Sequence, residues 1–187
     1  MARQKQYDEV EVLEKAMNLF WRNGYETTSM QMLEKEMGIN KFSIYSSFGS
    51  KNELFIESLK CYKLKLGGIM RKLQQADNGL VGIKQYFYDF LDFSKEDKIS
   101  KGCLVTNTAN EIHSDADQII HENLTQFTND VKQLFASVLA QDKSKSNVEI
   151  QQQAEYLLIS MFGLSSASRI FPPNQLKNYI EHIFKAI

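Results

Sequence analysis

The chain has 187 residues, of which 43% are hydrophobic and 24% are charged. These proportions are ordinary for a folded protein and exclude an intrinsically disordered one. The formal net charge is −1, so overall charge gives no attraction to nucleic acid, and any DNA contact must come from the local placement of side chains.

The sequence indicates no export, membrane insertion or disulfide framework. It contains no run of about 18 apolar residues, and the N-terminal stretch MARQKQYDEVEVL lacks the apolar core of a signal peptide. Two cysteines, Cys61 and Cys103, are too few for a disulfide scaffold. We therefore expect a cytoplasmic protein that has no membrane partner.

The first predicted helix is amphipathic. Apolar residues recur at spacings of three and four, the period of one helical face, at Val10, Leu13, Met17 and Phe20. Gly24 is the expected end of this helix, because glycine readily adopts the conformations that close helices.

Two short helices are predicted next. Thr28 and Gln31 fit a capping box, in which Thr28 starts the second helix and Gln31 reaches back to it. Gly38 ends that helix. Asn40 is the expected cap of the third helix, and Gly49 is its expected end. Two short helices joined by a tight turn that contains glycine predict a helix-turn-helix, whose second helix is free to enter a DNA groove.

A second capping box, from Ser50 to Glu53, opens a long fourth helix that runs into the seventies. The remaining predicted helices cover residues 80–94, 102–113, 116–140, 148–169 and 174–187, and the loops between them cover residues 76–79, 94–101, 141–146 and 171–174. No strand alternation persists. The predicted fold class is all-α, with a small N-terminal module at residues 1–50 and a larger helical bundle at residues 51–187.

The third predicted helix carries an unexpected apolar residue. At about 100° per residue, Phe42 lies opposite Ile44 and Phe48, which define the buried face. Ser43 and Ser46 fall on the side of Phe42. Two interpretations are open. Phe42 packs against a neighbour or is simply exposed, or this face meets DNA, where serines bond bases or phosphates and an aromatic edge contacts a thymine methyl group.

The stretch from Thr28 to Phe55 resembles the DNA-binding signature of the TetR family of bacterial transcription regulators. The resemblance rests on Gly38 in the turn, on IYSSF where the family has Leu-Tyr-x-x-Phe, on SKNELF for its Ser-Lys-x-x-Leu-Phe, and on the preceding run AMNLFWRNGYETTSM. It covers roughly residues 9–56 and is a joint pattern with fixed spacings. One departure concerns Phe42, where the family more often has a small residue such as Gly or Ala.

The resemblance implies a DNA-binding domain at residues 1–50 and a ligand-binding and dimerisation domain at residues 51–187. It implies a homodimer that binds a double-stranded DNA operator through the third helix and represses transcription until a small-molecule inducer releases it. The DNA-contacting residues that it implies are Thr28, Ser29, Lys41, Phe42, Ser43, Tyr45, Ser46 and Lys51. The basic arm of residues 2–6, which contains Arg3, is a further candidate for the DNA backbone or the minor groove.

The last two predicted helices carry apolar stripes. Gly163 and Ser165 lie between the apolar residues of the first stripe and let helices approach closely. Internal packing alone is the competing interpretation. The resemblance implies a four-helix dimer interface, to which we assign Leu157, Met161, Leu164, Leu176, Ile180, Ile183 and Phe184.

Aromatic and apolar side chains in the middle of the chain predict either a plain core or a core that holds a ligand pocket. They are Tyr62, Leu66, Met70, Tyr86, Phe87 and Phe90. The stretch KGCLVTNTANEIH (residues 101–113) adds Cys103, Asn107 and Glu111. Asn107 and Glu111 share a helical face, from which they either bind a ligand or serve capping and packing. Cys103 is either an inert buried thiol or a redox sensor that reacts as a thiolate.

No cofactor and no enzymatic activity are predicted, because the sequence shows no nucleophile–base set and no phosphate-binding loop. A metal-ligand spacing of a kind that is common by chance occurs at His113, Asp115, Asp117 and His121, and we assign no metal to it. Two alternatives to the ligand-responsive repressor are a thiol- or metal-responsive regulator on the same fold and a helical protein-interaction module without specific DNA binding.

Overall fold

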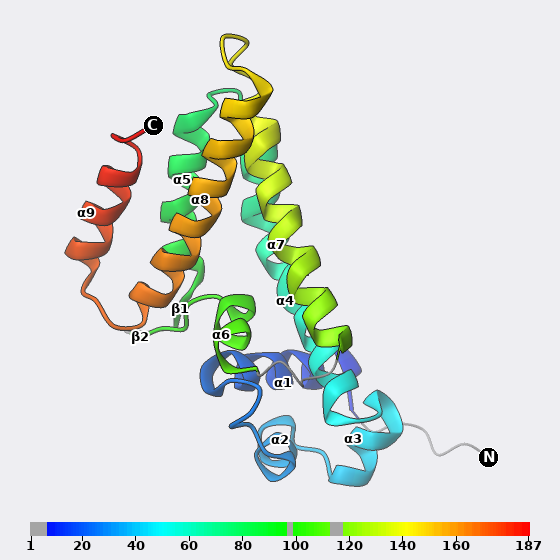
Figure 1. Cartoon of the computed structure of the whole chain (residues 1–187). Helices are drawn as coiled ribbons and strands as arrows, with labels where there is room; N and C mark the ends of the chain where they lie inside the picture. Colours follow the sequence, from blue (N-terminus) through cyan, green and yellow to red (C-terminus); the bar gives the residue numbers. More distant parts are fainter. Residues whose placement is uncertain (1–6, 97–98, 113–117) are drawn as a thin grey trace.

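The computed structural model describes residues 7–96, 99–112 and 118–187. Figure 1 shows a small group of helices, α1 to α3, at one end of a bundle of longer helices. The prediction of a helical fold is confirmed, with one short hairpin added. The elements are α1 (Glu9–Asn23), α2 (Met30–Met37), α3 (Lys41–Phe48), α4 (Lys51–Gln74), α5 (Leu80–Phe93), β1 (Lys95–Glu96), β2 (Ile99–Ser100), α6 (Leu104–Glu111), α7 (Gln118–Leu139), α8 (Asn147–Ser168) and α9 (Pro173–Ile183). No helix of the described residues is long and apolar enough to cross a membrane.

The helix-turn-helix begins and ends as predicted, with one exception. Asn40 caps α3, and Gly38, at φ 71°, closes α2. The prediction that Thr28 caps α2 is wrong, because Ser29 is the cap and its hydroxyl accepts a hydrogen bond from a first-turn amide at 3.2 Å. Thr28 instead lies in the interior, where its hydroxyl donates to the carbonyl of Gly24 at 2.6 Å.

The core of the N-terminal group is largely aromatic. The rings of Phe20 and Phe55 meet edge to face with centroids 5.0 Å apart, and Tyr25 lies 4.7 Å from Phe55. Val10, which we expected on the apolar face of α1, is 68% exposed, whereas Val12 is buried. Residues two apart on a helix point to different sides, so only one of this pair can join the core.

Helix α4 packs against both parts of the molecule. Its predicted capping box is confirmed: the Ser50 hydroxyl accepts from the Glu53 amide at 3.2 Å, and the Glu53 carboxylate accepts from the Ser50 amide at 2.7 Å. Along its length α4 contacts α1, α5 and α7. A domain boundary at residue 50 therefore stays a prediction, because the helix that follows it is shared.

The segment between α5 and α6 differs from its prediction. Residues 94–101 were expected to form a loop, but β1 and β2 pair here as a short antiparallel hairpin. The hydroxyl of Ser100 donates to that of Ser168 at 2.9 Å and ties the hairpin to the end of α8. Gly102, at φ 67°, then turns the chain, so that α6 begins two residues later than the start predicted at residue 102.

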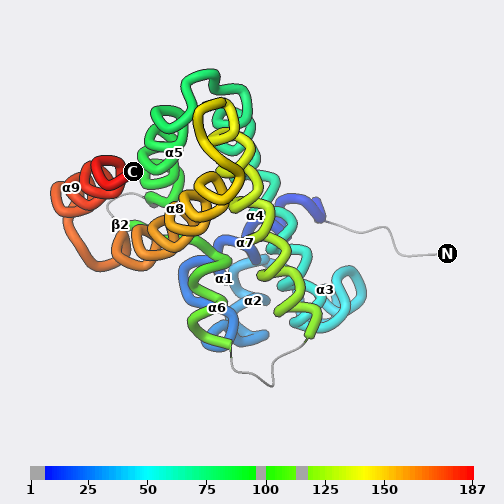
Figure 2. The backbone as a smooth tube through the Cα atoms, turned by 45° about the horizontal axis from the view of Figure 1, so that its top comes forward, coloured from blue at the N-terminus to red at the C-terminus, as the bar shows by residue number. Residues whose placement is uncertain are grey.

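Helix α6 joins the bundle to the N-terminal group, and Figures 1 and 2 both place it beside α1. The contact centres on Trp21, the single tryptophan of the chain. Its indole N–H donates to the carbonyl of Gly102 at 3.0 Å. The ammonium of Lys101 lies 4.0 Å from a Trp21 ring centroid, and the rings of Tyr62 and Phe93 pack at 4.9 and 5.3 Å.

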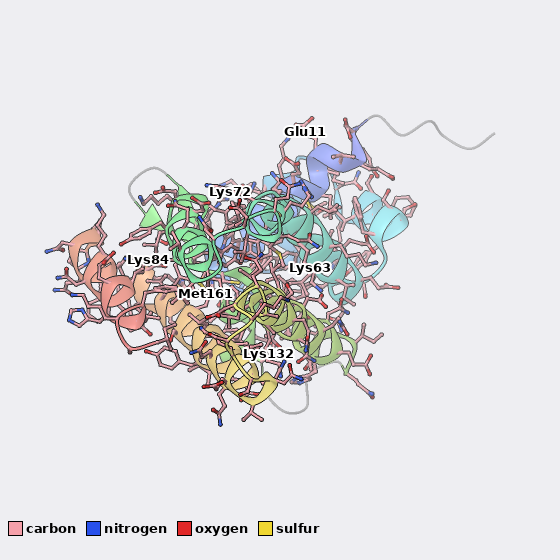
Figure 3. The ribbon with its side chains drawn as sticks, turned by 90° about the horizontal axis from the view of Figure 1, so that it is seen from above. Glu11, Lys63, Lys72, Lys84, Lys132 and Met161 are labelled. Carbon is pink, nitrogen blue, oxygen red and sulfur yellow. The ribbon has the colours of Figure 1, made fainter. Side chains whose placement is uncertain are left out.

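Helix α9 is held against α5. The ring of Phe184, just after α9, meets that of Phe87 edge to face at 5.2 Å. The carboxylate of Glu181 binds the ammonium of Lys84 at 2.8 Å and accepts from the Tyr88 hydroxyl at 2.7 Å. Figure 3 shows Lys84 on the side of α5 that faces α9.

Trp21→Phe tests the junction between α1 and α6. Loss of the indole N–H leaves the carbonyl of Gly102 without this donor, and we expect the free energy of unfolding to fall by about 1–3 kcal/mol. Urea unfolding followed by circular dichroism measures the change. Tyr156→Phe, at an exposed tyrosine of α8, is the control and should unfold like the wild type. An unchanged unfolding midpoint for Trp21→Phe would contradict the importance of this contact.

Candidate functional site

The outward face of α3 carries aromatic and polar side chains together. Phe42 is 81% exposed and Tyr45 is 44% exposed, whereas Ile44 between them is fully buried. The ammonium of Lys41 lies 5.6 Å from the centroid of the Tyr45 ring, and Ser46 is exposed on the same side. The predicted orientation of Phe42 is confirmed, and its contact with DNA stays a prediction.

Two side chains that the sequence reasoning missed support α3. The hydroxyl of Tyr7 bonds that of Ser47 at 2.7 Å and donates to the carbonyl of the half-buried Ser43 at 3.4 Å. The carboxylate of Glu34, in α2, accepts a hydrogen bond from the amide of Lys41 at the start of α3. Both contacts join separate elements, so no local pattern in the sequence marks them.

The three polar residues predicted at helix starts have different surroundings. Ser29 is exposed at the cap of α2. Thr28 is fully buried, so the prediction that it faces phosphate is wrong: its hydroxyl already serves an internal carbonyl. Lys51 is the first residue of α4, and its ammonium lies 4.5 Å from the centroid of the Tyr25 ring.

The surroundings of Lys51 combine partial burial, two nearby carboxylates and the N-terminus of α4. Burial lowers the pKa of its ammonium, and the carboxylates of Glu26 and Glu111 oppose that shift. A phosphate group at this position would interact with the cation and with the positive end of the α4 dipole. The arrangement is therefore suited to a contact with the DNA backbone.

A small cavity lies among α4, α5, α6, α7 and α8. Its volume is about 20 Å³, room for about one water molecule. Four of the residues predicted to bind a ligand line it: Leu66, Tyr86, Phe90 and Cys103. The lining that sequence reasoning did not assign to a ligand comprises Thr106, Phe127, Val131, Leu158, Met161, Phe162 and Ser165. Figure 3 shows Met161 between α8 and α5, on the inner side of α8.

The other aromatic and apolar residues predicted to bind a ligand do not line the cavity. The hydroxyl of Tyr62 donates to the sulfur of Cys103 at 3.3 Å, and burial raises the pKa of this hydroxyl far above its usual value. Met70 is half-buried against the core, one turn beyond the lining residue of α4. Phe87 does not line the cavity: its fully buried ring packs between Phe135 of α7 at 6.2 Å and Phe184 at 5.2 Å.

Asn107 and Glu111 do not face the cavity. The Asn107 amide donates to the carbonyl of Lys101 at 2.8 Å and to that of Trp21 at 3.4 Å. The Glu111 carboxylate accepts from the amide of Tyr25 at 2.7 Å and from the next amide at 3.3 Å. The prediction that they bind a ligand is wrong in this structure, because both side chains serve contacts within the chain. The competing interpretation, capping and packing, is confirmed.

The stripe assigned to a dimer interface is buried within the single chain. Phe184 packs on α5, as described above, and the other six side chains are at most 7% exposed: Leu157, Met161, Leu164, Leu176, Ile180 and Ile183. This prediction is therefore wrong, because α8 and α9 turn these residues towards each other and towards α5 and α7.

The outer side of α8 and the turn after it carry exposed apolar residues as well. Ile159 is 71% exposed and Ile170 is 80% exposed. Gly163 lies between them at helical spacing, and a Cβ atom placed on it would be 2.9 Å from the hydroxyl of Tyr179 on α9. The glycine therefore lets Tyr179 lie across α8. Because α8 is apolar on two sides, periodicity alone did not tell which side is internal.

Two predictions fall partly or wholly on residues that the structure does not describe. His113, Asp115 and Asp117 of the metal spacing lie outside the described residues, as does the arm of residues 2–6 with Arg3. Within residues 7–96, 99–112 and 118–187, no group of three or more His, Cys, Asp or Glu side chains is placed to hold a metal ion.

Comparison with protein families identifies the class of protein. The family model described as "Bacterial regulatory proteins, tetR family" matches residues 12–57. The family model described as "Tetracyclin repressor-like, C-terminal domain" matches residues 79–183, and this second match alone covers more than half of the chain. The chain therefore belongs to the TetR family and is a transcriptional regulator with a DNA-binding helix-turn-helix, not an enzyme.

Individual relatives agree with this assignment. The chain is 29% identical over 181 residues to the uncharacterized HTH-type transcriptional regulator YezE of Bacillus subtilis strain 168, covering 91% of this chain and 90% of YezE. It is 24% identical over 152 residues to IcaR of Staphylococcus aureus strain Newman, the negative transcriptional regulator of the biofilm operon icaADBC, covering 81% and 77% of the two chains.

Solved structures show the same fold. A cysteine mutant of the TetR family regulator CifR, complexed with 26-base-pair double-strand operator DNA, matches with a TM-score of 0.89 and 25% identity, covering 99% of both chains. The reduced form of Escherichia coli NemR matches with a TM-score of 0.77 and 23% identity, covering 92% of this chain and 93% of NemR.

Proposed function

We propose that this regulator is a dimeric repressor that binds a palindromic operator through α3 and is released by a small-molecule inducer. The observation that carries the proposal is the outward face of α3, where Phe42 and Tyr45 are exposed beside Lys41 and Ser46. The names of two similar proteins support it, since IcaR is a negative regulator and the CifR structure contains operator DNA.

On DNA, the α3 face enters the major groove. Phe42 supplies an apolar contact to a thymine methyl group, and Lys41 and Ser46 reach base edges or nearby phosphates. Ser43, which is half-buried, lies at the rim of the contact. Contacts that orient the protein on the DNA backbone come from Ser29, Tyr45 and Lys51.

The outer face of α8 and α9 binds a second copy of the chain. Ile159, Gly163 and Ile170 form an exposed stripe, beside which Tyr179 lies. A single α3 helix makes few DNA contacts, whereas a symmetric dimer places two α3 helices in successive major grooves about 34–36 Å apart. Dimerisation therefore supplies both affinity and the match to a palindrome.

The cavity is the proposed inducer site. Its lining is apolar with neutral polar groups, among them Tyr86, Thr106 and Ser165, which suits a small uncharged molecule that forms one or two hydrogen bonds. The cavity is nearly filled, so a ligand has to enlarge it. Ligand binding then favours a conformation in which α6 shifts against α1 and the two α3 helices no longer match the operator. A preference of about 5 kcal/mol for that conformation is enough for nearly complete release.

Phe42→Ala tests the DNA-reading face. Bound sequences are first selected from a random DNA pool, and affinity for the selected operator is measured by fluorescence anisotropy. We expect operator binding to weaken by about 1–3 kcal/mol, because an apolar contact to a base is lost, and the unfolding midpoint to stay unchanged.

Two controls accompany Phe42→Ala. Val10→Ala removes another exposed apolar side chain, outside α3, and should leave operator binding unchanged. Ile44→Ala should instead lower the free energy of unfolding by about 2–5 kcal/mol, because Ile44 is fully buried. The proposal fails if no selected sequence binds the wild type more tightly than random DNA does.

Ile159→Asp tests the dimer face. A charge at the centre of an apolar interface has to be desolvated on association, so we expect the variant to be monomeric by light scattering and to lose operator affinity. Val81→Asp, at an exposed β-branched apolar residue on α5, is the matched control and should remain dimeric. A dimeric Ile159→Asp protein would exclude this face as the interface.

A thiol-responsive regulator is a second candidate function. The thiol of Cys103 lines the cavity, stands at the N-cap of α6 and receives a hydrogen bond from Tyr62. The similar structures are a cysteine mutant of CifR and the reduced form of NemR, names that fit cysteine chemistry in this fold.

Alkylation separates the two candidates. In the Cys61→Ser protein, Cys103 is the one remaining cysteine, and N-ethylmaleimide should weaken operator binding by tenfold or more if this thiol is the sensor, roughly the size of a typical allosteric coupling. The Cys103→Ser protein should keep its affinity under the same treatment. Equal responses of the two variants would assign Cys103 to packing alone.

A further inference from the structure

The last turn of α6 holds the loop that follows α1. The Glu111 carboxylate accepts from the amides of Tyr25 at 2.7 Å and Glu26 at 3.3 Å. It lies against Gly24 so closely that a Cβ atom there would overlap it. The loop therefore wraps around one carboxylate that comes from the other part of the molecule.

The position of Glu111 is not explained by the stability of α6 itself. A negative side chain in the last turn of a helix is unfavourable, because the C-terminal end of the helix dipole is negative as well. The amides of Tyr25 and Glu26 offset this cost, because both donate hydrogen bonds to the charged carboxylate. A residue that breaks a local rule in this way is often retained for function.

The loop held by Glu111 supports the first turn of α4. The ring of Tyr25 packs between Phe20 at 6.2 Å and Phe55 at 4.7 Å, and the ammonium of Lys51 lies 4.5 Å above it. The hydroxyl of Tyr25 donates to the side chain of Asn52, also in the first turn. Fixing the loop backbone therefore fixes the surface on which the Lys51 side chain rests.

The opposite end of α6 reaches the cavity. Cys103 and Thr106 belong to the cavity lining, and Glu111 is the last residue of the helix. An eight-residue helix is about 12 Å long, so one short element spans the distance between the cavity lining and Glu111. A displacement at the cavity is therefore carried directly to the carboxylate that holds the Tyr25 loop.

We propose that Glu111 is a positioning residue for operator binding: it holds the α1–α2 loop so that Tyr25 presents Lys51 to the DNA backbone, and movement of α6 releases that hold. The inference rests on the proposed DNA-binding function. It adds the residue through which the helical bundle acts on the N-terminal helices α1 to α3. In this inference, a change at the cavity end of α6 alters the position of Glu111, and the contact of Lys51 with phosphate changes as a result.

The first test needs no DNA. Hydrogen exchange at the amides of Tyr25 and Glu26 is compared in wild type, Glu111→Ala and Glu111→Gln. We expect faster exchange in the alanine variant, because the one carboxylate oxygen that accepts from both amides is lost, and protection in the glutamine variant, whose side-chain oxygen still accepts. Unchanged protection in Glu111→Ala would overturn the inference whatever the protein binds.

The second test measures operator affinity across a range of salt concentrations. Glu111→Ala should weaken binding by about tenfold and reduce the slope of log K against log salt by about 2, one phosphate contact for each subunit of the dimer. Glu111→Gln should restore both. Glu26→Gln is the matched control: it removes a carboxylate that also attracts Lys51 but does not hold the loop amides, and it should bind like the wild type.

A double-mutant cycle decides whether Glu111 acts through Lys51. If it does, adding Glu111→Ala to Lys51→Met costs no further affinity, whereas independent effects multiply. Multiplying effects, or an alanine variant with the wild-type salt slope, would overturn the inference while the proposed function stands. A wild type that binds no operator would overturn the proposed function, and with it the proposed role of Glu111 in DNA binding. The hydrogen-exchange experiment would still show whether Glu111 holds the amides of Tyr25 and Glu26.

Discussion

The contact between Trp21 and the turn into α6 is the constraint on which the rest of the structure depends. The indole donates to the carbonyl of Gly102 and is enclosed by Tyr62 and Phe93, so α1, α4, α5 and the start of α6 share one buried contact. Cys103 follows directly and lines the cavity. The N-terminal helices and the cavity are therefore linked through one packed contact.

The features that could be predicted from the sequence are local ones. The outward position of Phe42 follows from its angle to Ile44 along one helix, and the box formed by Ser50 and Glu53 is a contact across a single turn. Such features depend on neighbours within about four residues, where helical geometry leaves few alternatives. Membership of the TetR family rests on a run of these local features with fixed spacings.

The features that could not be predicted depend on distant partners. Asn107 and Glu111 were correctly placed on one face of a helix, but that face meets the end of α1 and the loop after it, 86 positions away in the sequence. Helix α8 is apolar on two sides, so the internal stripe of Leu157 and Leu164 was taken for the outer one. Thr28 and Ser29 are both good caps, and burial of the threonine decides between them.

If the nearly filled cavity is the inducer site, as proposed, its packing has a consequence for how new ligand specificities arise. Its walls include bulky buried side chains such as Phe90 and Phe127, and shortening one of them opens space for a different molecule within the bundle. Each Phe→Ala change at a buried wall costs about 3–5 kcal/mol of folding stability, which a ligand that fills the space restores by mass action. A regulator retuned in this way would report its new signal through its own cellular abundance as well as through the promoter.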